Sequence, residues 1–205
     1  MRRKPERLFA KSVREVRTGS RQCSQNQKMK KLEEHLFRNG VYTYAVLDGA
    51  AVPDLPRKLF EMKQPNVCLY RGELSPDIVY VAPYLVQMFP GQEFTTWLLQ
   101  NFRRKNWGIF AQSSKSMVTM RTHFRSFLTV YDETGKPLLF RFYDPRVLSI
   151  YLPTCNGGEL TTFFGSVTCY FAENENADRF DRFEFANGEL LTTPLEIFPP
   201  RAVGY

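Results

Sequence analysis

The sequence predicts one compact α/β domain over residues 29–205, in which helices flank a mixed β-sheet. Segments with helical and with strand-like patterns alternate along the chain, an order that fits α+β domains as well. Two strand-like segments joined by a short Gly-containing loop indicate a β-hairpin, so antiparallel pairs are expected beside parallel ones. No repeat, low-complexity stretch or linker divides this range.

The composition is that of a folded chain. Of 205 residues, 43% are hydrophobic, and 18 Phe and 10 Tyr supply large side chains for a core. A wholly disordered chain is excluded, because disorder requires few aromatic residues. The longest apolar stretch, Ile78–Phe89, is interrupted by Pro83 and Gln87, so the sequence predicts no membrane-spanning helix.

Positive charge is concentrated at the start of the chain. Residues 1–31 hold 11 Lys or Arg and 2 acids, whereas the remaining residues hold 17 Lys or Arg and 19 acids. We expect residues 1–28 to form a disordered basic tail, or to precede the true translation start at Met29. The tail supports one alternative function, a nucleic-acid-binding protein that acts through it. The nearly neutral remainder argues against nucleic acid as a partner of the domain itself.

In the first half of the domain, β-branched and aromatic residues predict strands, and apolar residues three or four apart predict helices. Asp54 is placed to cap the second of these helices. Pro83 interrupts an apolar run, so Tyr84–Met88 is expected to be a turn. The expected strands cover 41–47, 67–70, 78–82 and 107–111, and the expected helices cover 30–38, 54–62 and 93–103.

In the second half, the clearest helix signal is Asp144 followed by Pro145, which places a capping residue directly before a favoured first helical residue. We expect the Asp144 carboxylate to accept hydrogen bonds from backbone N–H groups or from an arginine. A stripe of Met and Phe at helical spacing predicts another helix over 117–127. The other expected elements are helices at 145–152 and 158–164, and strands at 128–131, 138–143, 167–171, 182–185 and 189–192.

Residues that could act as catalytic bases or metal ligands are scarce. His35 and His123 are the only histidines, and the four cysteines show no CxxC spacing. On its helix, His123 would lie between Arg121 and Arg125, whose charge would disfavour the protonated imidazole. We therefore expect neither a metal site nor a cofactor.

Three residues are conceivable nucleophiles of a hydrolase: Asp48, Asp144 and Cys155. None has a credible general base in the sequence, so the chain is not expected to be an enzyme. Cys68 and Cys169 lie in apolar runs, where a free thiol behaves as a small hydrophobic group. Reduced cysteines are typical of a cytoplasmic protein.

The most unusual local sequence surrounds Arg141, which stands between Phe140 and Phe142 in a predicted strand. An arginine at such a position is costly unless it is paired. One interpretation is an ion-pair network that fixes a helix against the sheet. The other is a basic pocket that receives a carboxylate or backbone carbonyls from a partner. The candidate polar residues, with Asp144 as the nearest carboxylate, are Arg121, Arg125, Arg141, Asp144 and Arg146.

Seven short segments, in this order, resemble the adaptor, or effector-chaperone, family of bacterial type VI secretion systems. The resemblance covers about residues 41–168. The family's HLR motif corresponds to His123-Phe124-Arg125 here, and its usual Gly-Pro-Val corresponds to Gly165-Ser166-Val167. The segments are YAVLDGA (44–50), LY (69–70), APYLV (82–86), WGIF (107–110), RTHFR (121–125), FRFYDPRVL (140–148) and FFGSV (163–167).

The resemblance implies a cytoplasmic, non-catalytic protein without a cofactor. Such an adaptor would bind a toxic effector and help to load it onto the trimeric spike protein of the secretion system. Its expected partners are therefore the effector and the spike protein, with no membrane involved. The resemblance assigns no contact residues, so the binding surface has to come from the structure.

Overall fold

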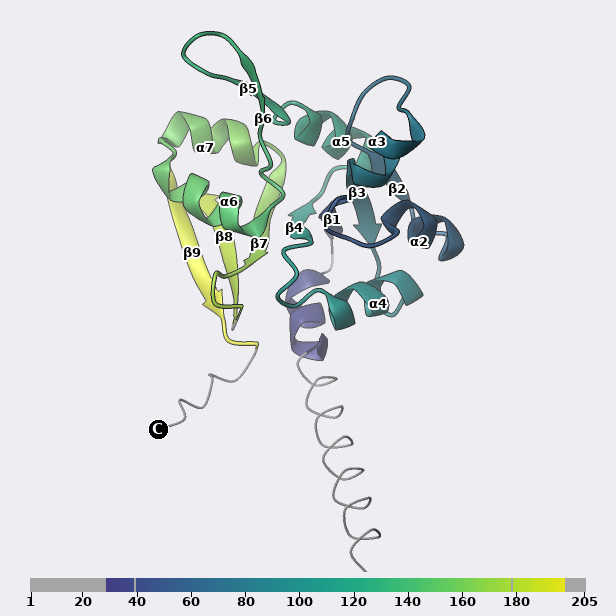
Figure 1. Cartoon of the computed structure of the whole chain (residues 1–205). Helices are drawn as coiled ribbons and strands as arrows, with labels where there is room; N and C mark the ends of the chain where they lie inside the picture. The colour runs from purple at the N-terminus through teal and green to yellow at the C-terminus, as the bar shows by residue number, and fades with distance from the viewer. Residues whose placement is uncertain (1–28, 39, 178, 198–205) are drawn as a thin grey trace, which may run out of the picture.

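The computed structural model describes residues 29–38, 40–177 and 179–197, which form three layers: a twisted sheet and a group of helices on each of its faces (Figure 1). The α/β fold with helices packed on a sheet is thus confirmed. The prediction for residues 1–28 lies outside the described residues.

The strands of the main sheet lie in the order β2-β3-β1-β4-β7-β8-β9. A separate two-stranded sheet consists of β5 and β6. The strands are β1 (Tyr42–Asp48), β2 (Asn66–Cys68), β3 (Pro83–Met88), β4 (Gly108–Ser113), β5 (Thr129–Tyr131), β6 (Pro137–Leu139), β7 (Val167–Glu173), β8 (Phe180–Ala186) and β9 (Glu189–Leu195).

The sheet differs from the expected mixed one, because every pairing among the described strands is antiparallel. The strand–helix–strand pattern of β3, α4 (Glu93–Asn101) and β4 does give two parallel strands. Strand β1 lies between them and runs antiparallel to both, so the two parallel strands are never neighbours. Sequence order indicated the direction of these strands correctly but not which strands pair.

The helices divide between the two faces of the sheet. One face is covered by the helix at 29–36 (purple in Figure 1), α2 and α4, and the other by α5, α6 and α7. The bounds of the helices other than α4 are α2 (Leu55–Glu61), α3 (Pro76–Val81), α5 (Met117–Arg125), α6 (Pro145–Tyr151), the 3-10 helix η1 (Leu152–Thr154) and α7 (Gly157–Phe164).

Alternation along β1 shows how one strand serves both cores. Ala45 and Leu47 belong to the core beneath α2 and α4, whereas Tyr44 and Val46 belong to the core beneath α5, α6 and α7. Successive side chains of a strand point to opposite faces, so a strand covered on both sides reads as one continuous apolar run. This is why YTYAVLD shows no polar alternation although it is a strand.

The apolar run around Pro83 was predicted wrongly in both halves. Of residues 78–82, expected to be a strand, 78–81 lie in helix α3, whose exposed side chains include Ile78 and Tyr80. Residues 84–88, expected to be a turn, form strand β3. Pro76 at the start of α3 is a helix signal, and Pro83 takes the first position of a strand, where a missing N–H is tolerated.

Two smaller expectations also differ from the structure. Asp54 precedes α2, but it has a positive φ of 52° and its side chain makes no capping hydrogen bond. The strand expected at 138–143 ends at Leu139, and Arg141–Asp144 form a turn before α6. Phe142 in this turn is buried in the core beneath α5 and α7, because a chain that turns inward can bury an aromatic ring without belonging to a sheet.

Candidate functional site

The polar residues predicted from the sequence gather near one end of the sheet, where β1 ends and β3 begins. The carboxylate at their centre, Asp48, was not among these candidates; it is the last residue of β1 and is buried. It accepts a hydrogen bond from the backbone N–H of Ala50, at 3.0 Å, and forms an ion pair with Arg141 Nη2. Arg141 therefore pairs with Asp48 rather than with the nearby Asp144.

A pair of tyrosines adjoins the Asp48–Arg141 ion pair. The Arg141 guanidinium lies 6.0 Å from the centre of the Tyr143 ring, and Tyr143 is hydrogen-bonded to Tyr70. Burial, and then the charge of Asp48, raise the pKa of Tyr143 above its usual value. Both tyrosines are thus neutral hydrogen-bonding groups at neutral pH, and they join the loop after β2 to the turn before α6.

Asp144 caps α6 as the Asp-Pro pattern predicts. Its Oδ1 accepts from the backbone N–H of Arg146 at 3.0 Å, and its two oxygens accept from Arg146 Nε and Nη2 at 3.0 and 2.6 Å. The predicted helix start at Pro145 is confirmed. The carboxylate is buried, whereas the side chain of Arg146 is 60% exposed, so the pair lies at the surface.

Arg125 fastens helix α5 to the end of β2. Its Nε donates to the carbonyl oxygen of Leu69 at 2.9 Å, and its Nη2 donates to those of Cys68 and Tyr70 at 2.9 and 2.6 Å. The backbone carbonyls that this arginine binds are therefore supplied by the chain itself. The structure thus separates the candidate residues into Arg141 with Asp48, Arg146 with Asp144, and Arg125 with backbone.

Arg121 lies one helical turn before Arg125 and has a different environment. Its Nε is buried and has no hydrogen-bond partner among the described residues. The predicted convergence of four arginines on one carboxylate does not occur within the described part of the chain, and neither Arg121 nor Arg125 forms a salt bridge there.

His123 projects from another side of α5 than the two arginines. Its Nε2 lies 3.0 Å from the carbonyl oxygen of Phe163, and its ring contacts Phe127 edge-on. Burial lowers the pKa of His123, and the hydrogen bond to Phe163 opposes this shift. The cause is therefore burial rather than the predicted repulsion by arginines, and His123 joins α5 to α7.

The hairpin formed by β5 and β6 projects beyond α5 and α7 (Figure 1). All six residues of its strands are exposed, and they include Val130, Tyr131, Leu138 and Leu139. A hairpin was expected at this place, but its separation from the main sheet and its exposure could not be read from the sequence, because short apolar strands usually pack on a core.

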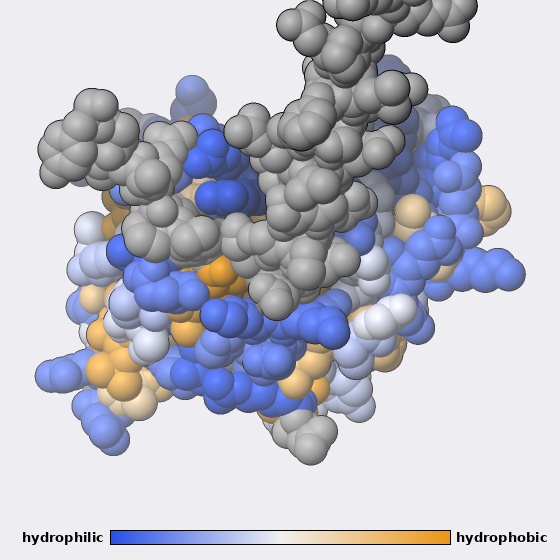
Figure 2. Space-filling model, turned by 90° about the horizontal axis from the view of Figure 1, so that it is seen from below, coloured by the Kyte–Doolittle hydropathy of each residue, from blue (hydrophilic) through white to orange (hydrophobic). Residues whose placement is uncertain are grey.

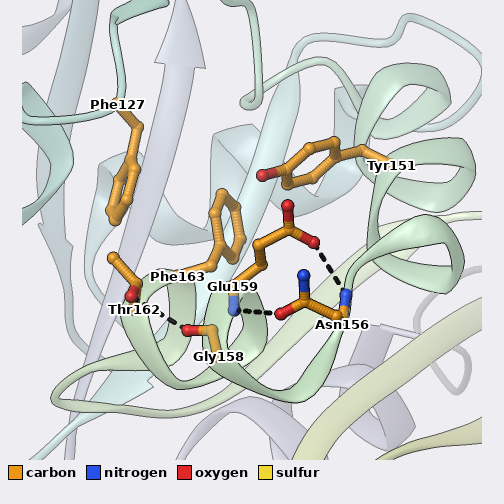
Figure 3. Close-up of a pocket in the computed structure, with 7 residues that line it drawn as sticks. All are labelled: Phe127, Tyr151, Asn156, Gly158, Glu159, Thr162 and Phe163. Carbon is orange, nitrogen blue, oxygen red and sulfur yellow. Dashed lines mark hydrogen bonds between the residues drawn. The ribbon is translucent and has the colours of Figure 1, made fainter.

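A pocket of about 360 Å³ lies at the base of this hairpin. Figure 3 shows its aromatic walls, Phe127, Tyr151 and Phe163, beside the first turn of α7. Asn156 and Glu159 form a reciprocal capping box there, with hydrogen bonds of 3.0 and 2.7 Å. The Glu159 carboxylate oxygen that is not used in the box points toward Tyr151 (Figure 3).

The described residues offer neither a metal site nor a membrane-spanning helix. Within residues 29–38, 40–177 and 179–197, no group of three His, Cys, Asp or Glu side chains could hold a metal ion. In that same part of the chain, no helix has both the length and the apolar character needed to cross a bilayer. Cys68, Cys155 and Cys169 are free thiols.

These features define an α/β domain with a buried ion-pair network at one end of its sheet and a projecting apolar hairpin. The chain belongs to the family described as Domain of unknown function (DUF4123), whose model matches residues 43–162. The matched range includes all the predicted polar residues and the hairpin. A search of curated proteins and a search of solved structures each found no match.

Proposed function

We propose that this chain is a non-catalytic adaptor that binds a type VI secretion effector and assists its loading onto the spike protein. The family-like segments around Asp48, His123 and Asp144 support this proposal, as described for the sequence. The observation that carries it is the β5–β6 hairpin, whose large apolar side chains lie outside both cores.

The hairpin presents apolar groups on both of its faces. Val130 pairs with Leu138, and Thr129 with Leu139. Neighbouring pairs point to opposite faces of a strand pair, so both faces carry a large side chain. Tyr131 is 70% exposed and Leu139 is 55% exposed. Exposed apolar residues concentrated in one projecting element are typical of a surface that another protein covers.

The base of the hairpin is anchored. Phe140 N–H donates to the carbonyl oxygen of Leu128 at 2.9 Å, and the Phe140 ring lies 4.8 Å from that of Tyr151. The Phe127 ring lies 5.0 Å from that of Phe163. A two-stranded hairpin is marginally stable on its own. These aromatic contacts hold its orientation before a partner arrives, which lowers the entropic cost of binding.

The opposite end of the molecule is more polar where its described residues can be seen (Figure 2). Of the described residues visible from below in Figure 2, most are hydrophilic, and hydrophobic residues occur in small separate groups. The exposed apolar residues of the hairpin thus distinguish it from this face.

The conceivable nucleophiles are engaged in structural contacts. Asp48 is paired with Arg141, and Asp144 caps α6. Burial raises the pKa of the Cys155 thiol, which keeps it protonated and weakly nucleophilic. These environments support a binding role over a hydrolytic one.

The test is delivery of effectors by the bacterium that encodes this chain. Deleting its gene should abolish delivery of one effector, for which the product of the adjacent toxin gene is the first candidate, and spare the other effectors. Complementation with Tyr131→Ser/Leu139→Ser should fail, whereas Phe60→Ser should succeed, since Phe60 is 84% exposed on α2, away from the hairpin. Unchanged delivery of every effector after the deletion would contradict the proposal.

A further inference from the structure

Three arginines lie beside one another where α5 contacts the end of β2. Arg125 binds the carbonyl oxygens of Cys68, Leu69 and Tyr70, so the next residue, Arg71, starts beside it. Arg121 is four residues before Arg125 and projects from the same side of α5. We call Arg71, Arg121 and Arg125 the arginine cluster.

The positive charge of the arginine cluster is not neutralised within the described chain. None of the salt bridges among the described residues includes a member of the cluster. In contrast, both Arg141 and Arg146 have a buried carboxylate as partner. Burial lowers the pKa of Arg125, and the charges of Arg121 and Arg71 lower it further.

Arg121 has a hydrogen-bond donor that the described part of the chain does not satisfy. Its Nε is buried yet has no acceptor in the part of the chain that the structure describes. A buried guanidinium N–H without an acceptor is costly, because it has lost its hydrogen bonds to water. This cost shows that no acceptor in the described chain holds the guanidinium. Because Nε is enclosed by the chain, a carboxylate of another molecule would bind the Nη groups of Arg121, which are not among the buried atoms without a partner.

We propose that the arginine cluster binds a carboxylate side chain of the protein partner. This inference rests on the proposed function for the existence of that partner. A carboxylate fits a planar guanidinium through two parallel hydrogen bonds. Arg125 is held by backbone carbonyls and acts as a positioning residue, whereas Arg121 and the exposed Arg71 donate to the ligand.

Two observations favour a protein carboxylate over the phosphates of a nucleic acid. Residues 32–205 hold 17 Lys or Arg and 19 acids, so the domain lacks the net positive charge that is typical of a nucleic-acid-binding domain. Helix α5 ends at Arg125 and β5 begins at Thr129, so the cluster and the apolar hairpin adjoin along the chain and one protein partner can contact both.

The test uses the full chain and two fluorescent probes, an octaglutamate peptide and a dT20 oligonucleotide, with anisotropy as the measurement. Arg71→Gln/Arg121→Gln should weaken binding of the peptide by about tenfold. Arg38→Gln and Lys63→Gln together are the matched control, because they remove two exposed positive charges elsewhere. The control should change binding less than twofold. Equal losses of peptide affinity in both variants would overturn the inference. So would a larger loss of affinity for the oligonucleotide than for the peptide in the cluster variant.

Thermal unfolding of Arg121→Gln separates binding from a structural role. Since Arg121 Nε has no acceptor in the described chain, this variant should unfold at the same temperature as the wild type or at a higher one. A clear decrease would overturn the inference by assigning Arg121 to the fold. If the peptide binds through the cluster but no effector binds the chain, the proposed function fails and the carboxylate site stands.

Discussion

Replacing Asp144 by Ala should lower the free energy of unfolding by about 1–2 kcal/mol. The carboxylate accepts from the backbone N–H of Arg146 at 3.0 Å, and loss of such a cap costs about 1 kcal/mol. Its pair with the Arg146 side chain adds less than about 1 kcal/mol, because that side chain is 60% exposed. For a chain of this size, the expected decrease in melting temperature is roughly 2–8 °C.

Two companion variants divide this effect between the cap and the ion pair. Asp144→Asn retains a capping oxygen and removes the charge, and Arg146→Ala removes the ion pair and retains the cap. Each should destabilise the protein less than Asp144→Ala does. The measurement is urea unfolding followed by circular dichroism. Equal stability of Asp144→Ala and the wild type at pH 7 would refute the reasoning.

Because of the Asp144–Arg146 pair, the free energy of unfolding should depend on pH. Burial favours the protonated carboxyl, but the hydrogen bonds from Arg146 hold the pKa of Asp144 below its usual value. Because the pKa is lower in the folded than in the unfolded state, the ionised carboxylate stabilises the fold at pH values above the unfolded-state pKa. This stabilisation is lost as the pH falls through the folded-state pKa. The stability difference between the wild type and Asp144→Ala should therefore shrink below about pH 4.

Two further predictions concern the packing and charge of the sheet. Gly108→Ala should destabilise the fold by more than about 2 kcal/mol in urea unfolding, because its Cβ would clash with the carbonyl oxygen of Val46; wild-type stability would contradict this. Burial raises the pKa of Glu173 to about 7. A raised carboxyl pKa means that stability is lost as the pH rises from about 4.5 to 7, by at most roughly 3 kcal/mol. Glu173→Gln should therefore be more stable than the wild type at pH 8 and flatten this pH profile, and an unchanged profile would contradict the assignment.

Local signals in the sequence predicted local structure well. Asp144-Pro145 gave both the start of α6 and the hydrogen bonds of its cap, because a cap depends on residues within one helical turn. The Met and Phe stripe gave α5, and the Gly-containing loop gave the hairpin of β5 and β6. Pro83 misled because proline punctuates turns in most contexts, yet here it begins a strand.

Contacts between distant parts of the chain could not be predicted. Asp48 and Arg141 are 93 positions apart, and no local pattern indicates which carboxylate a strand-like arginine will find. The free donor of Arg121 and the exposure of Tyr131 likewise depend on what the rest of the fold leaves uncovered. The resemblance placed these residues in one family-like region, but their roles required the three-dimensional contacts.

The most direct test of the adaptor account is hydrogen–deuterium exchange on the full chain, alone and co-purified with the product of the adjacent toxin gene. The account predicts a stable complex in which the amides of β5 and β6 exchange more slowly than in the free chain, while those of α2 are unchanged. Failure to form a complex with any effector of the same cell, or protection confined to α2 and α4, would contradict it.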